Sequence, residues 1–392
     1  MKYLRVYPKF TKSVLLLGPR GTGKSTYIKD IIKPNLTIDL LKTSVFRELL
    51  KNPSLIEDMI SHVLAGETVF IDEIQKIPEL LDEVHRLIEN KKIKFILTGS
   101  SARKLKKQGV NLLAGRAIYQ KFFPLSLFEI KNRKPIDSIL FTGLLPYALS
   151  LDSNADCNDF LFSYVESYLK EEIFQEGLTR NLADFTYFLE LAGQYHGQII
   201  NYENIAREVS KSGEAVKAWF QILEDTLIGE MIEPYSLNLY PKETKHKKFY
   251  FFDHGIARAA SGIKTMEEVA EKKGFYLESL ILNELKVYKE VKKENFKIYF
   301  YNVSGKGDVD FIIEVKKKTL SQPAEFITLE IKNTKKWNSQ FSQLQHEIKN
   351  NFPKKCRKSI AVYRGEQRLT QKGIEIFPLD QFIESLWSGE II

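Results

Sequence analysis

The hydrophobic pattern of the first third of the chain predicts a parallel β-sheet. Between residue 12 and about residue 123, short apolar runs alternate with polar stretches that suit helices. Short buried strands separated by helices are typical of a parallel sheet covered on both faces. The strands predicted from these runs are Val14–Leu17, Leu36–Leu40, Val69–Ile71, Lys94–Leu97 and Ala117–Phe123.

Two further regions have different patterns. From about residue 155 to 230 the apolar positions recur with a helical period, as at 160, 161, 164, 165, 168 and 169. From about residue 265 a long helix is followed by strands, which indicates a separate α+β unit. Its predicted elements, in order, are Tyr276–Lys289, Phe296–Val303, Val309–Val315, Phe326–Lys332 and Gln340–Asn350. The chain is therefore predicted to be a multidomain α/β protein.

Composition narrows the class of protein only slightly. The 392 residues suffice for two or three domains, and the 58 Lys and Arg against 50 Asp and Glu give a net charge of +8. This excess is compatible with a nucleic-acid partner but does not require one. No apolar run is long enough to cross a membrane, and the distant pair Cys157 and Cys356 predicts neither a disulfide framework nor a zinc site. We expect a soluble, cytoplasmic protein.

A glycine-rich loop with the pattern GxxxxGK[ST] follows the first predicted strand and precedes a helix-compatible stretch. Its residues are Gly18, Pro19, Arg20, Gly21, Thr22, Gly23, Lys24, Ser25 and Thr26. In this context the backbone N–H groups converge on phosphate oxygens at a helix N-terminus. Lys24 is expected to contact the β- and γ-phosphates, and the Ser25 hydroxyl is expected to bind Mg²⁺. The sequence thus predicts an ATP site.

The third predicted strand delivers two adjacent carboxylates, as a hydrolytic site requires. Asp72 is expected to hold Mg²⁺ and Glu73 to polarise the water that attacks the γ-phosphate. After the fourth strand, Ser100 or Ser101 is placed to sense the γ-phosphate or orient that water. Either serine is also a good helix N-cap, and both interpretations can hold together.

Arg116 comes directly before the last predicted strand of this region. The arrangement resembles the AAA-plus ATPases, in which an arginine finger at this point reaches the nucleotide of a neighbouring subunit. Such a finger stabilises charge on the transferred phosphoryl group. Arg103 is the alternative candidate, and an ordinary surface arginine is the other interpretation. A finger acting in trans implies a homo-oligomer.

Further motifs extend the resemblance to nearly the whole chain. They are Thr98–Ser101, Ala114–Arg116 and the run Pro124–Glu129. Together they resemble prokaryotic AAA-plus ATPases that carry a C-terminal domain of unknown function. The resemblance implies the AAA-plus fold and ATP use. Gly21 departs from it, because a bulkier residue is expected there.

Residues 184–260 are predicted to form a winged helix-turn-helix, after a helical connector at 131–183 and the ATPase domain at 1–130. Its predicted elements are Asp184–His196, Tyr202–Val209, Gly213–Thr226, Leu227–Pro234 and Lys248–Phe252. The third helix should read the major groove, but it is net acidic, which disfavours contact with phosphates. The wing tip instead carries a basic group: Lys242, Lys245, His246, Lys247 and Lys248. DNA contact through the wing and a protein-binding role for the helices are both open.

The last region, 261–392, resembles the PD-(D/E)XK nuclease core. Asp310 begins one strand, and Glu330 and Lys332 share a face of the next. In that resemblance Asp310 and Glu330 bind Mg²⁺, with Mn²⁺ as an alternative, Glu278 on the preceding helix adds a carboxylate, and Lys332 positions the water. Gln343 and Gln345 are weaker candidates for substrate contacts. A cross-strand Glu–Lys ion pair is the alternative reading.

Two functions follow from these features. The first is an ATP-hydrolysing protein that acts on DNA and has a metal-dependent nuclease-like C-terminal domain. The second is a nucleotide-operated regulatory switch whose C-terminal domains bind protein partners without cleaving nucleic acid. Steep loss of DNA affinity with salt would favour the first.

Overall fold

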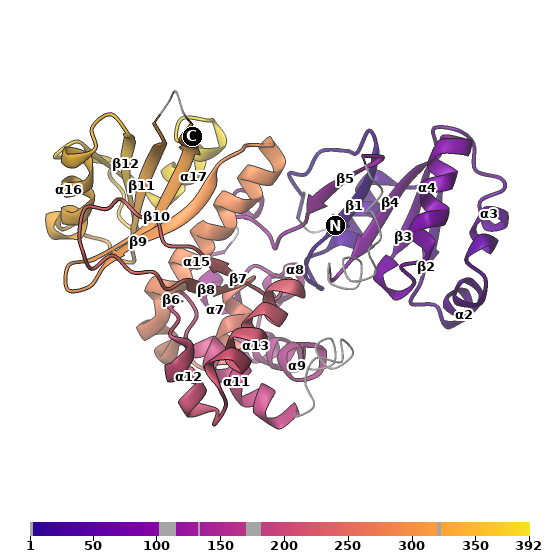
Figure 1. The fold of residues 1–392 in the computed structure, drawn as a ribbon, viewed down its shortest axis with the longest axis horizontal. Coiled ribbons are helices and arrows are strands. Elements are labelled where there is room, and N and C mark those ends of the chain that lie inside the picture. Colours follow the sequence, from indigo (N-terminus) through magenta and orange to yellow (C-terminus); the bar gives the residue numbers. More distant parts are fainter. Residues whose placement is uncertain (1–2, 102–114, 132–133, 170–181, 320–322) are drawn as a thin grey trace.

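The computed structural model describes residues 3–101, 115–131, 134–169, 182–319 and 323–392. Figure 1 shows three units: an N-terminal sheet with its helices at the right, a helical part at the bottom, and a C-terminal sheet at the left. We call these the N-terminal unit (3–131), the middle unit (134–260) and the C-terminal unit (261–392). Within the described ranges, no helix has the length and apolar character needed to cross a membrane.

The N-terminal unit contains a five-stranded parallel sheet in the order β2-β3-β4-β1-β5. The strands are β1 Ser13–Leu17, β2 Leu36–Asp39, β3 Thr68–Asp72, β4 Lys94–Gly99 and β5 Ala117–Lys121. The helices are α1 Lys24–Tyr27, which continues as a π-helical turn at Ile28–Ile32, α2 Thr43–Lys51, α3 Ile56–Met59 and α4 Leu80–Lys91. All five predicted strands are confirmed, with ends shifted by a few residues.

Both faces of this sheet are buried, as a continuous apolar strand pattern requires. Leu15 and Leu17 of β1 pack in one core with α4, while Val14 and Leu16 pack in another with Tyr27. Alternate residues of a strand point to opposite faces, so the single run Val14–Leu17 contributes to both cores. The sheet therefore holds the loop after β1 on a rigid base.

The middle unit is mainly helical. Its helices are α7 Ile136–Thr142, α8 Pro146–Ser150, α9 Asn154–Ser163, α11 Leu182–Gln194, α12 Tyr202–Glu208, α13 Gly213–Asp225 and α14 His254–Ala260, and α6 Leu127–Ile130 precedes them. The strands β6 Gln198–Ile199, β7 Gly229–Ile232 and β8 Lys248–Phe251 form an antiparallel sheet in the order β6-β8-β7. The helices and strands expected between 184 and 253 are present at nearly the expected positions.

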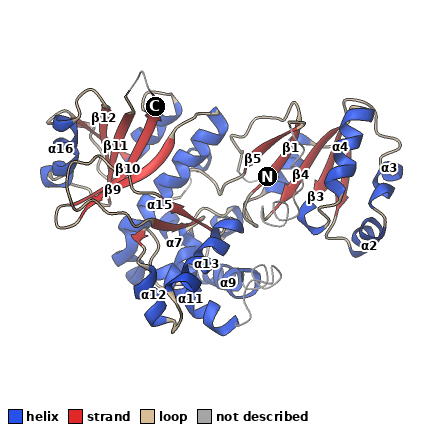
Figure 2. Cartoon of the chain, viewed as in Figure 1, coloured by secondary structure: helices blue, strands red, loops and turns tan. Residues whose placement is uncertain are grey.

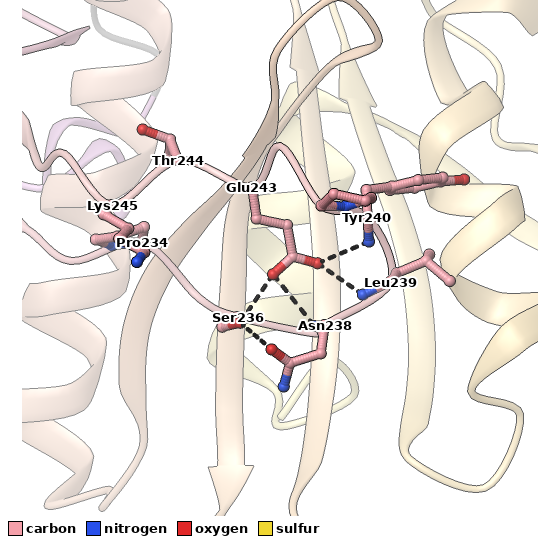
Figure 3. Close-up of a pocket in the computed structure, with 9 residues that line it drawn as sticks. Pro234, Ser236, Asn238, Leu239, Tyr240, Glu243, Thr244 and Lys245 are labelled. Carbon is pink, nitrogen blue, oxygen red and sulfur yellow. Dashed lines mark hydrogen bonds between the residues drawn. The ribbon is translucent and has the colours of Figure 1, made fainter.

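The segment between β7 and β8, residues 233–247, lies along the edge of the C-terminal sheet. Its backbone forms hydrogen bonds with β9, including Tyr235 N to Phe300 O at 2.7 Å and Thr244 N to Asn302 O at 3.1 Å. The Glu243 carboxylate accepts hydrogen bonds from the backbone N–H groups of Asn238 and Leu239, which closes the segment into a loop. This loop lines a cavity of about 620 Å³ (Figure 3). Part of the segment between the two predicted wing strands is therefore hydrogen-bonded to the edge of the C-terminal sheet.

The C-terminal unit is a six-stranded mixed sheet in the order β13-β14-β12-β11-β10-β9. The strands are β9 Lys297–Val303, β10 Gly307–Lys316, β11 Glu325–Lys332, β12 Cys356–Tyr363, β13 Leu369–Gln371 and β14 Ile374–Pro378. The helices are α15 Met266–Lys292, α16 Gln343–Asn351 and α17 Leu379–Trp387. The helices and strands stand out by colour in Figure 2. The predicted α+β character is confirmed, and α15 begins ten residues before the predicted helix.

The C-terminal helix returns to the N-terminal unit. Trp387 of α17 stacks on Phe128 of α6 with ring centroids 4.6 Å apart, and its indole N–H donates to Glu284 of α15 at 2.6 Å. Burial raises the pKa of the Glu284 carboxyl to about 7. The three units are thus joined by packed contacts as well as by the chain.

Candidate functional site

The phosphate loop has the backbone that its glycines allow. Gly21 and Gly23 have φ angles of +80° and +90°, a region that side chains with a Cβ rarely adopt. The position where a bulkier residue was expected thus needs a glycine for its conformation. The Lys24 ammonium, at the start of α1, donates to the carbonyls of Gly18 at 2.6 Å and Pro19 at 2.9 Å. Lys24 is therefore held at the mouth of the loop, as a phosphate-binding lysine requires.

The two predicted carboxylates lie at the end of β3, beside the loop. Asp72 is buried, and its Oδ1 accepts a hydrogen bond from the Thr98 hydroxyl of β4 at 2.5 Å. Glu73 adopts φ +62° and accepts a hydrogen bond from the side-chain amide of Gln75. Ser100 Oγ lies 3.4 Å from Glu73 Oε2 and receives a hydrogen bond from Gln75 at 3.0 Å. The structure therefore brings Asp72, Glu73 and Ser100 together.

The phosphate-loop residues 20–26, Asp72 and Glu73 line one cavity of about 470 Å³. The sequence analysis gave no site role to the other residues that line it: Tyr3, Arg5, Leu41, Leu125, Pro146, Tyr147 and Ser150. Pro146 and Tyr147 belong to α8 of the middle unit, so the cavity lies between two units. Its phosphate-loop residues suit phosphates, and its apolar and aromatic side chains suit a nucleotide base.

Arg5 is another residue whose place at the site the sequence did not reveal. Its side chain is 2% exposed and its guanidinium pairs with Glu129 at 2.9 Å. It also donates to the carbonyl of Thr22 in the phosphate loop at 2.8 Å and to that of Phe123 at 2.8 Å. Glu129 forms a capping box with Ser126 at the start of α6. The run Pro124–Glu129 is therefore tied through Arg5 to the nucleotide cavity.

Arg116 lies at the start of β5, at the opposite end of the strands from the phosphate loop. β5 runs parallel to β1, with Ala117 opposite Ser13 and Lys121 opposite Leu17. Arg116 therefore lies near the first residue of β1, whereas the phosphate loop follows its last residue. The guanidinium forms an ion pair with Glu89 of α4, and the Arg116 side chain is 35% exposed. Arg116 does not line the cavity of its own subunit. The alternative candidate, Arg103, lies outside the described residues.

The predicted carboxylates of the C-terminal unit gather around two lysines. The ammonium of Lys248, from β8 of the middle unit, lies 3.1 Å from Glu278 Oε1 and 3.2 Å from Asp308 Oδ2. Lys332 pairs with Glu330, and its ammonium lies 4.0 Å from Asp310 Oδ2. We call these residues the carboxylate cluster. The expectation that Lys248 belongs to an exposed basic group is wrong, because the carboxylates of α15 and β10 stabilise its charge in a buried position.

Burial raises the pKa of three carboxyl groups in this cluster, those of Glu278, Asp310 and Glu330. It raises the pKa of Glu278 to about 7, against the opposing effect of Lys248, and raises the pKa of Glu330 well above its usual value, with a further rise from Asp310. Burial also raises the pKa of Asp310. Burial alone would lower the pKa of Lys248, but Glu278 and Asp308 together raise it above the usual range. The cluster is a strongly interacting group of charges.

An open cavity of about 450 Å³ adjoins the cluster. Asp308, Glu330, Lys332 and Gln343 are among its lining residues. Glu330 is 2% exposed, and its Oε2 has no hydrogen-bond partner among the described residues. Gln345 instead lies in the core, where its amide donates to the carbonyl of Ile360 at 2.8 Å. Gln343 is thus placed at the cavity and Gln345 is not.

The carboxylates do not surround one point as metal ligands do. In the part of the chain that the structure describes, no group of three His, Cys, Asp or Glu side chains is arranged to hold a metal ion. Glu278 is turned to Lys248 and to the hydroxyl of Tyr250, while Glu330 is turned to Lys332. The oxygen donors suit a hard divalent cation by type, but in this arrangement they do not fit one.

Three protein families match successive parts of the chain. Residues 11–131 match a family described as AAA domain, residues 133–267 match a domain of unknown function (DUF8612), and residues 273–382 match a second domain of unknown function (DUF4143). The N-terminal unit, with its five-stranded parallel sheet and phosphate loop, is therefore an AAA-type ATPase domain. Domains of this type bind ATP, usually with Mg²⁺.

Curated relatives extend over most of the chain. The uncharacterized proteins Rv2008c of Mycobacterium tuberculosis and Mb2031c of Mycobacterium bovis are each 24% identical over 308 residues, which are 77% of this chain and 67% of theirs. The uncharacterized protein MJ1544 of Methanocaldococcus jannaschii is 22% identical, over 79% of this chain and 74% of its own. The similarity therefore extends beyond the ATPase domain, which is shorter than the matched length.

Among solved structures, that of the Aeropyrum pernix ORC1 protein in complex with DNA is similar to this chain, at 12% identity and a TM-score of 0.27, over 67% of this chain and 87% of that chain.

Proposed function

We propose that the chain hydrolyses ATP in the cavity at the phosphate loop and uses the nucleotide state to rearrange its middle and C-terminal units. The observation that carries this proposal is the composition of the cavity, which combines phosphate-loop residues with Pro146 and Tyr147 of the middle unit. A ligand held by both units favours the arrangement in which they close on it. Binding and release of nucleotide would then change the position of the middle unit relative to the ATPase domain.

Each residue of the cavity has a role in this proposal. Lys24 and the loop N–H groups bind the β- and γ-phosphates. Mg²⁺ held by Ser25 and Asp72 would neutralise charge on these phosphates. Glu73 orients the attacking water and accepts its proton, while Ser100 keeps the Glu73 carboxylate in place. The purine base would pack against Tyr147, one of the aromatic residues that line the cavity.

The test is hydrogen exchange of α8 with and without a slowly hydrolysed ATP analogue. We expect the analogue to protect both the phosphate loop and α8 in the natural chain, and neither in Lys24→Ala. Protection of the loop with no change at α8 would contradict closure of the middle unit on the nucleotide. Lys29→Ala, on the π-helical turn beyond the cavity, is a control that keeps normal protection.

We further propose that Arg116 acts in trans in a homo-oligomer. Its position far from the cavity of its own subunit and its exposure support this role. The ion pair with Glu89 is a surface contact that a phosphate group could replace. Arg116→Ala should keep ATP binding and lose turnover, whereas Glu89→Gln should keep both. Unchanged turnover in Arg116→Ala would remove the role.

DNA is the partner that we propose for the middle unit, as a winged helix-turn-helix. The order of elements supports it: α11, β6, α12, α13, β7 and β8, with β8 between the other strands. The docked segment 233–247 and the acidic α13 limit which surfaces could contact phosphates. Affinity for DNA should fall steeply as salt rises. Binding that is absent at low salt, with and without ATP, would instead support the regulatory switch that binds protein partners.

A second candidate function is metal-dependent cleavage of DNA at the carboxylate cluster. The observation that favours it is the open cavity beside Glu330, whose Oε2 is buried and has no hydrogen-bond partner within the part of the chain that the structure describes. Glu278, Asp310 and Glu330 would hold Mg²⁺ or Mn²⁺ after a rearrangement, and Lys332 would position the attacking water.

Cleavage should be measured on circular and linear DNA with Mg²⁺ or Mn²⁺, with and without ATP, for the natural chain, Lys332→Ala and Glu73→Gln. Cleavage that Lys332→Ala abolishes would establish the nuclease, and Glu73→Gln would report whether hydrolysis is coupled to it. Normal ATP turnover without cleavage under any condition would leave the switch as the function.

A further inference from the structure

The three units of the chain meet around a cavity of about 360 Å³, which we call the junction cavity. Its walls come from β5 and the residues after it, from β7 of the middle unit, and from α15 and β9 of the C-terminal unit. Half of its lining residues are apolar or aromatic, among them Phe123, Leu282 and Ile298, and three are lysines. Its described lining residues belong neither to the phosphate loop nor to the carboxylate cluster.

The three lysines are close enough to repel one another. Lys286 of α15 forms an ion pair with Glu230 of β7, its side chain is 17% exposed, and its ammonium lies 4.8 Å from the centroid of the Phe123 ring. Burial lowers the pKa of Lys286, against the effect of Glu230, and also lowers the pKa of Lys289. The positive charge of Lys121 lowers both further. A cavity that collects three such groups attracts anions.

Two of these lysines are left without an ion pair. In the described ranges, neither the Lys121 nor the Lys289 ammonium pairs with a carboxylate. Glu290 also lines the cavity, but it accepts a hydrogen bond from the backbone N–H of Lys121 at 3.1 Å and attracts the two ammonium groups only at longer range. Lys297, at the start of β9, adds positive charge near Lys289. An anion with two negative charges would therefore have two lysines to bind.

The lining residues also indicate the class of anion. A phosphate monoester carries a charge of about −1.5 to −2 at pH 7 and has three strong acceptor oxygens, which matches two ammonium groups. The apolar half of the lining suits a small organic group attached to the phosphate. A DNA backbone is bound through basic side chains and needs no apolar recess, so the mixed lining favours a small ligand.

We propose that the junction cavity binds a small phosphate monoester, with its phosphate between Lys121 and Lys289 and its organic group against Phe123, Leu282 and Ile298. The site is separate from the ATP site and does not depend on ATP hydrolysis. A ligand bound there would contact all three units at once. It would therefore stabilise the arrangement in which the three units meet.

A second cavity, of about 260 Å³, separates this site from the phosphate loop. It shares four lining residues with the junction cavity, Lys121 among them, and is also lined by Gly18 and Pro19. The carbonyls of these two loop residues accept hydrogen bonds from the Lys24 ammonium. Because the loop itself is expected to bind phosphates, the test must be made on chains in which the loop lysine is removed.

The experiment is titration calorimetry of phenyl phosphate into the full chain carrying Lys24→Ala. We expect phenyl phosphate to bind, and to bind more tightly than phenol or inorganic phosphate, because each of those supplies only one half of the ligand. Adding Lys121→Met or Lys289→Met should weaken binding of phenyl phosphate about tenfold or more, through loss of a charge-assisted hydrogen bond.

Lys272→Met is the matched control for net charge. Lys272 is also on α15, about 25 Å from Lys289 along the helix axis, and does not line the cavity. Its replacement should leave the affinity for phenyl phosphate unchanged. Glu290→Gln should tighten binding, because it removes a negative charge beside the two lysines while keeping an acceptor for the Lys121 N–H. That variant keeps the test decisive if a lysine variant does not fold.

Four results would overturn the proposal. The first is no binding of phenyl phosphate to the chain with Lys24→Ala, and the second is an equal loss of affinity in Lys272→Met and Lys289→Met, which would assign the effect to net charge. The third is inorganic phosphate binding as tightly as phenyl phosphate, because the apolar lining would then contribute nothing. The fourth is displacement of phenyl phosphate by duplex DNA without terminal phosphates, which would assign the lysines to a nucleic-acid backbone.

Discussion

The buried ion pair between Arg5 and Glu129 should contribute strongly to both stability and nucleotide binding. Arg5 joins the N-terminal segment, the phosphate loop and α6 through hydrogen bonds to Glu129 and to the carbonyls of Thr22, Phe123 and Pro124. Arg5→Met keeps a long side chain of similar volume but removes every donor. The Glu129 carboxylate would then be buried without the guanidinium.

The size of the effect can be worked out from these contacts. Removing one partner of a buried ion pair costs about 3–5 kcal/mol. Glu129 still accepts hydrogen bonds from the N–H groups of Val6 at 2.7 Å and Ser126 at 2.9 Å, so its own loss should lie at the lower end. The carbonyls that lose a donor add about 1 kcal/mol or more. We therefore expect the N-terminal unit to lose about 4 kcal/mol of unfolding free energy.

The assay is urea unfolding of the full chain, read at the transition that an ATP analogue shifts, because ligand binding marks the N-terminal unit. Arg5→Met, Glu129→Gln and the double variant form a cycle, with an expected coupling energy of about 2 kcal/mol. Arg86→Met, which removes an exposed ion pair with Glu57, is the control and should show no measurable change. A loss below about 0.5 kcal/mol in Arg5→Met, additive with Glu129→Gln, would refute the reasoning.

Three other predictions concern single side chains. Thr98→Val removes the hydrogen bond to Asp72, so it should raise the Mg²⁺ concentration needed for half-maximal ATP turnover and slow turnover about tenfold; an unchanged Mg²⁺ requirement would exclude a positioning role for Thr98. Tyr147→Ala should weaken ATP binding about tenfold through loss of base stacking, measured by fluorescent nucleotide titration, while Tyr187→Ala, another exposed tyrosine, should not. Burial raises the pKa of Glu284 from 4.5 to about 7, so the folded chain retains a proton that the unfolded chain releases. Stability should therefore fall by about 3 kcal/mol as pH rises from 4.5 through 7, and Glu284→Gln should flatten this profile in unfolding measured at a series of pH values. A profile as steep in Glu284→Gln as in the natural chain would assign the effect to other groups.

Local patterns in the sequence were enough to predict the strands and the phosphate-binding residues of the ATPase domain. The strands of its sheet are continuous apolar runs, and the phosphate loop, Asp72 and Glu73 each follow directly from a strand end. Their meeting at one edge is a consequence of parallel pairing, which the alternation of strands and helices already implied. Gln75 could have been suspected, since it lies two residues after Glu73, but its hydrogen bonds depend on the turn that Glu73 makes at φ +62°.

Residues brought together by tertiary packing were out of reach of such patterns. Tyr3, Arg5 and Tyr147 carry no motif, and only the folding of the N-terminal segment and α8 over the loop places them in one cavity. Lys248 shows the opposite error. The residues directly before it are basic and polar, which suggested an exposed group, yet its partners Glu278 and Asp308 lie 30 and 60 residues further along the chain. The burial of this lysine therefore depends on carboxylates that are distant in sequence.

The docking of residues 233–247 on β9 has a consequence for the behaviour of the chain in concentrated solution. β9 is the last strand of the six-stranded sheet, and a bare edge strand offers unpaired N–H and C=O groups to any other extended chain. Tyr235 and Thr244 satisfy part of that edge from within the same molecule. A deletion within 233–247 should therefore expose the edge of β9 to strand pairing with other molecules. We expect such a variant to aggregate before it loses ATP turnover.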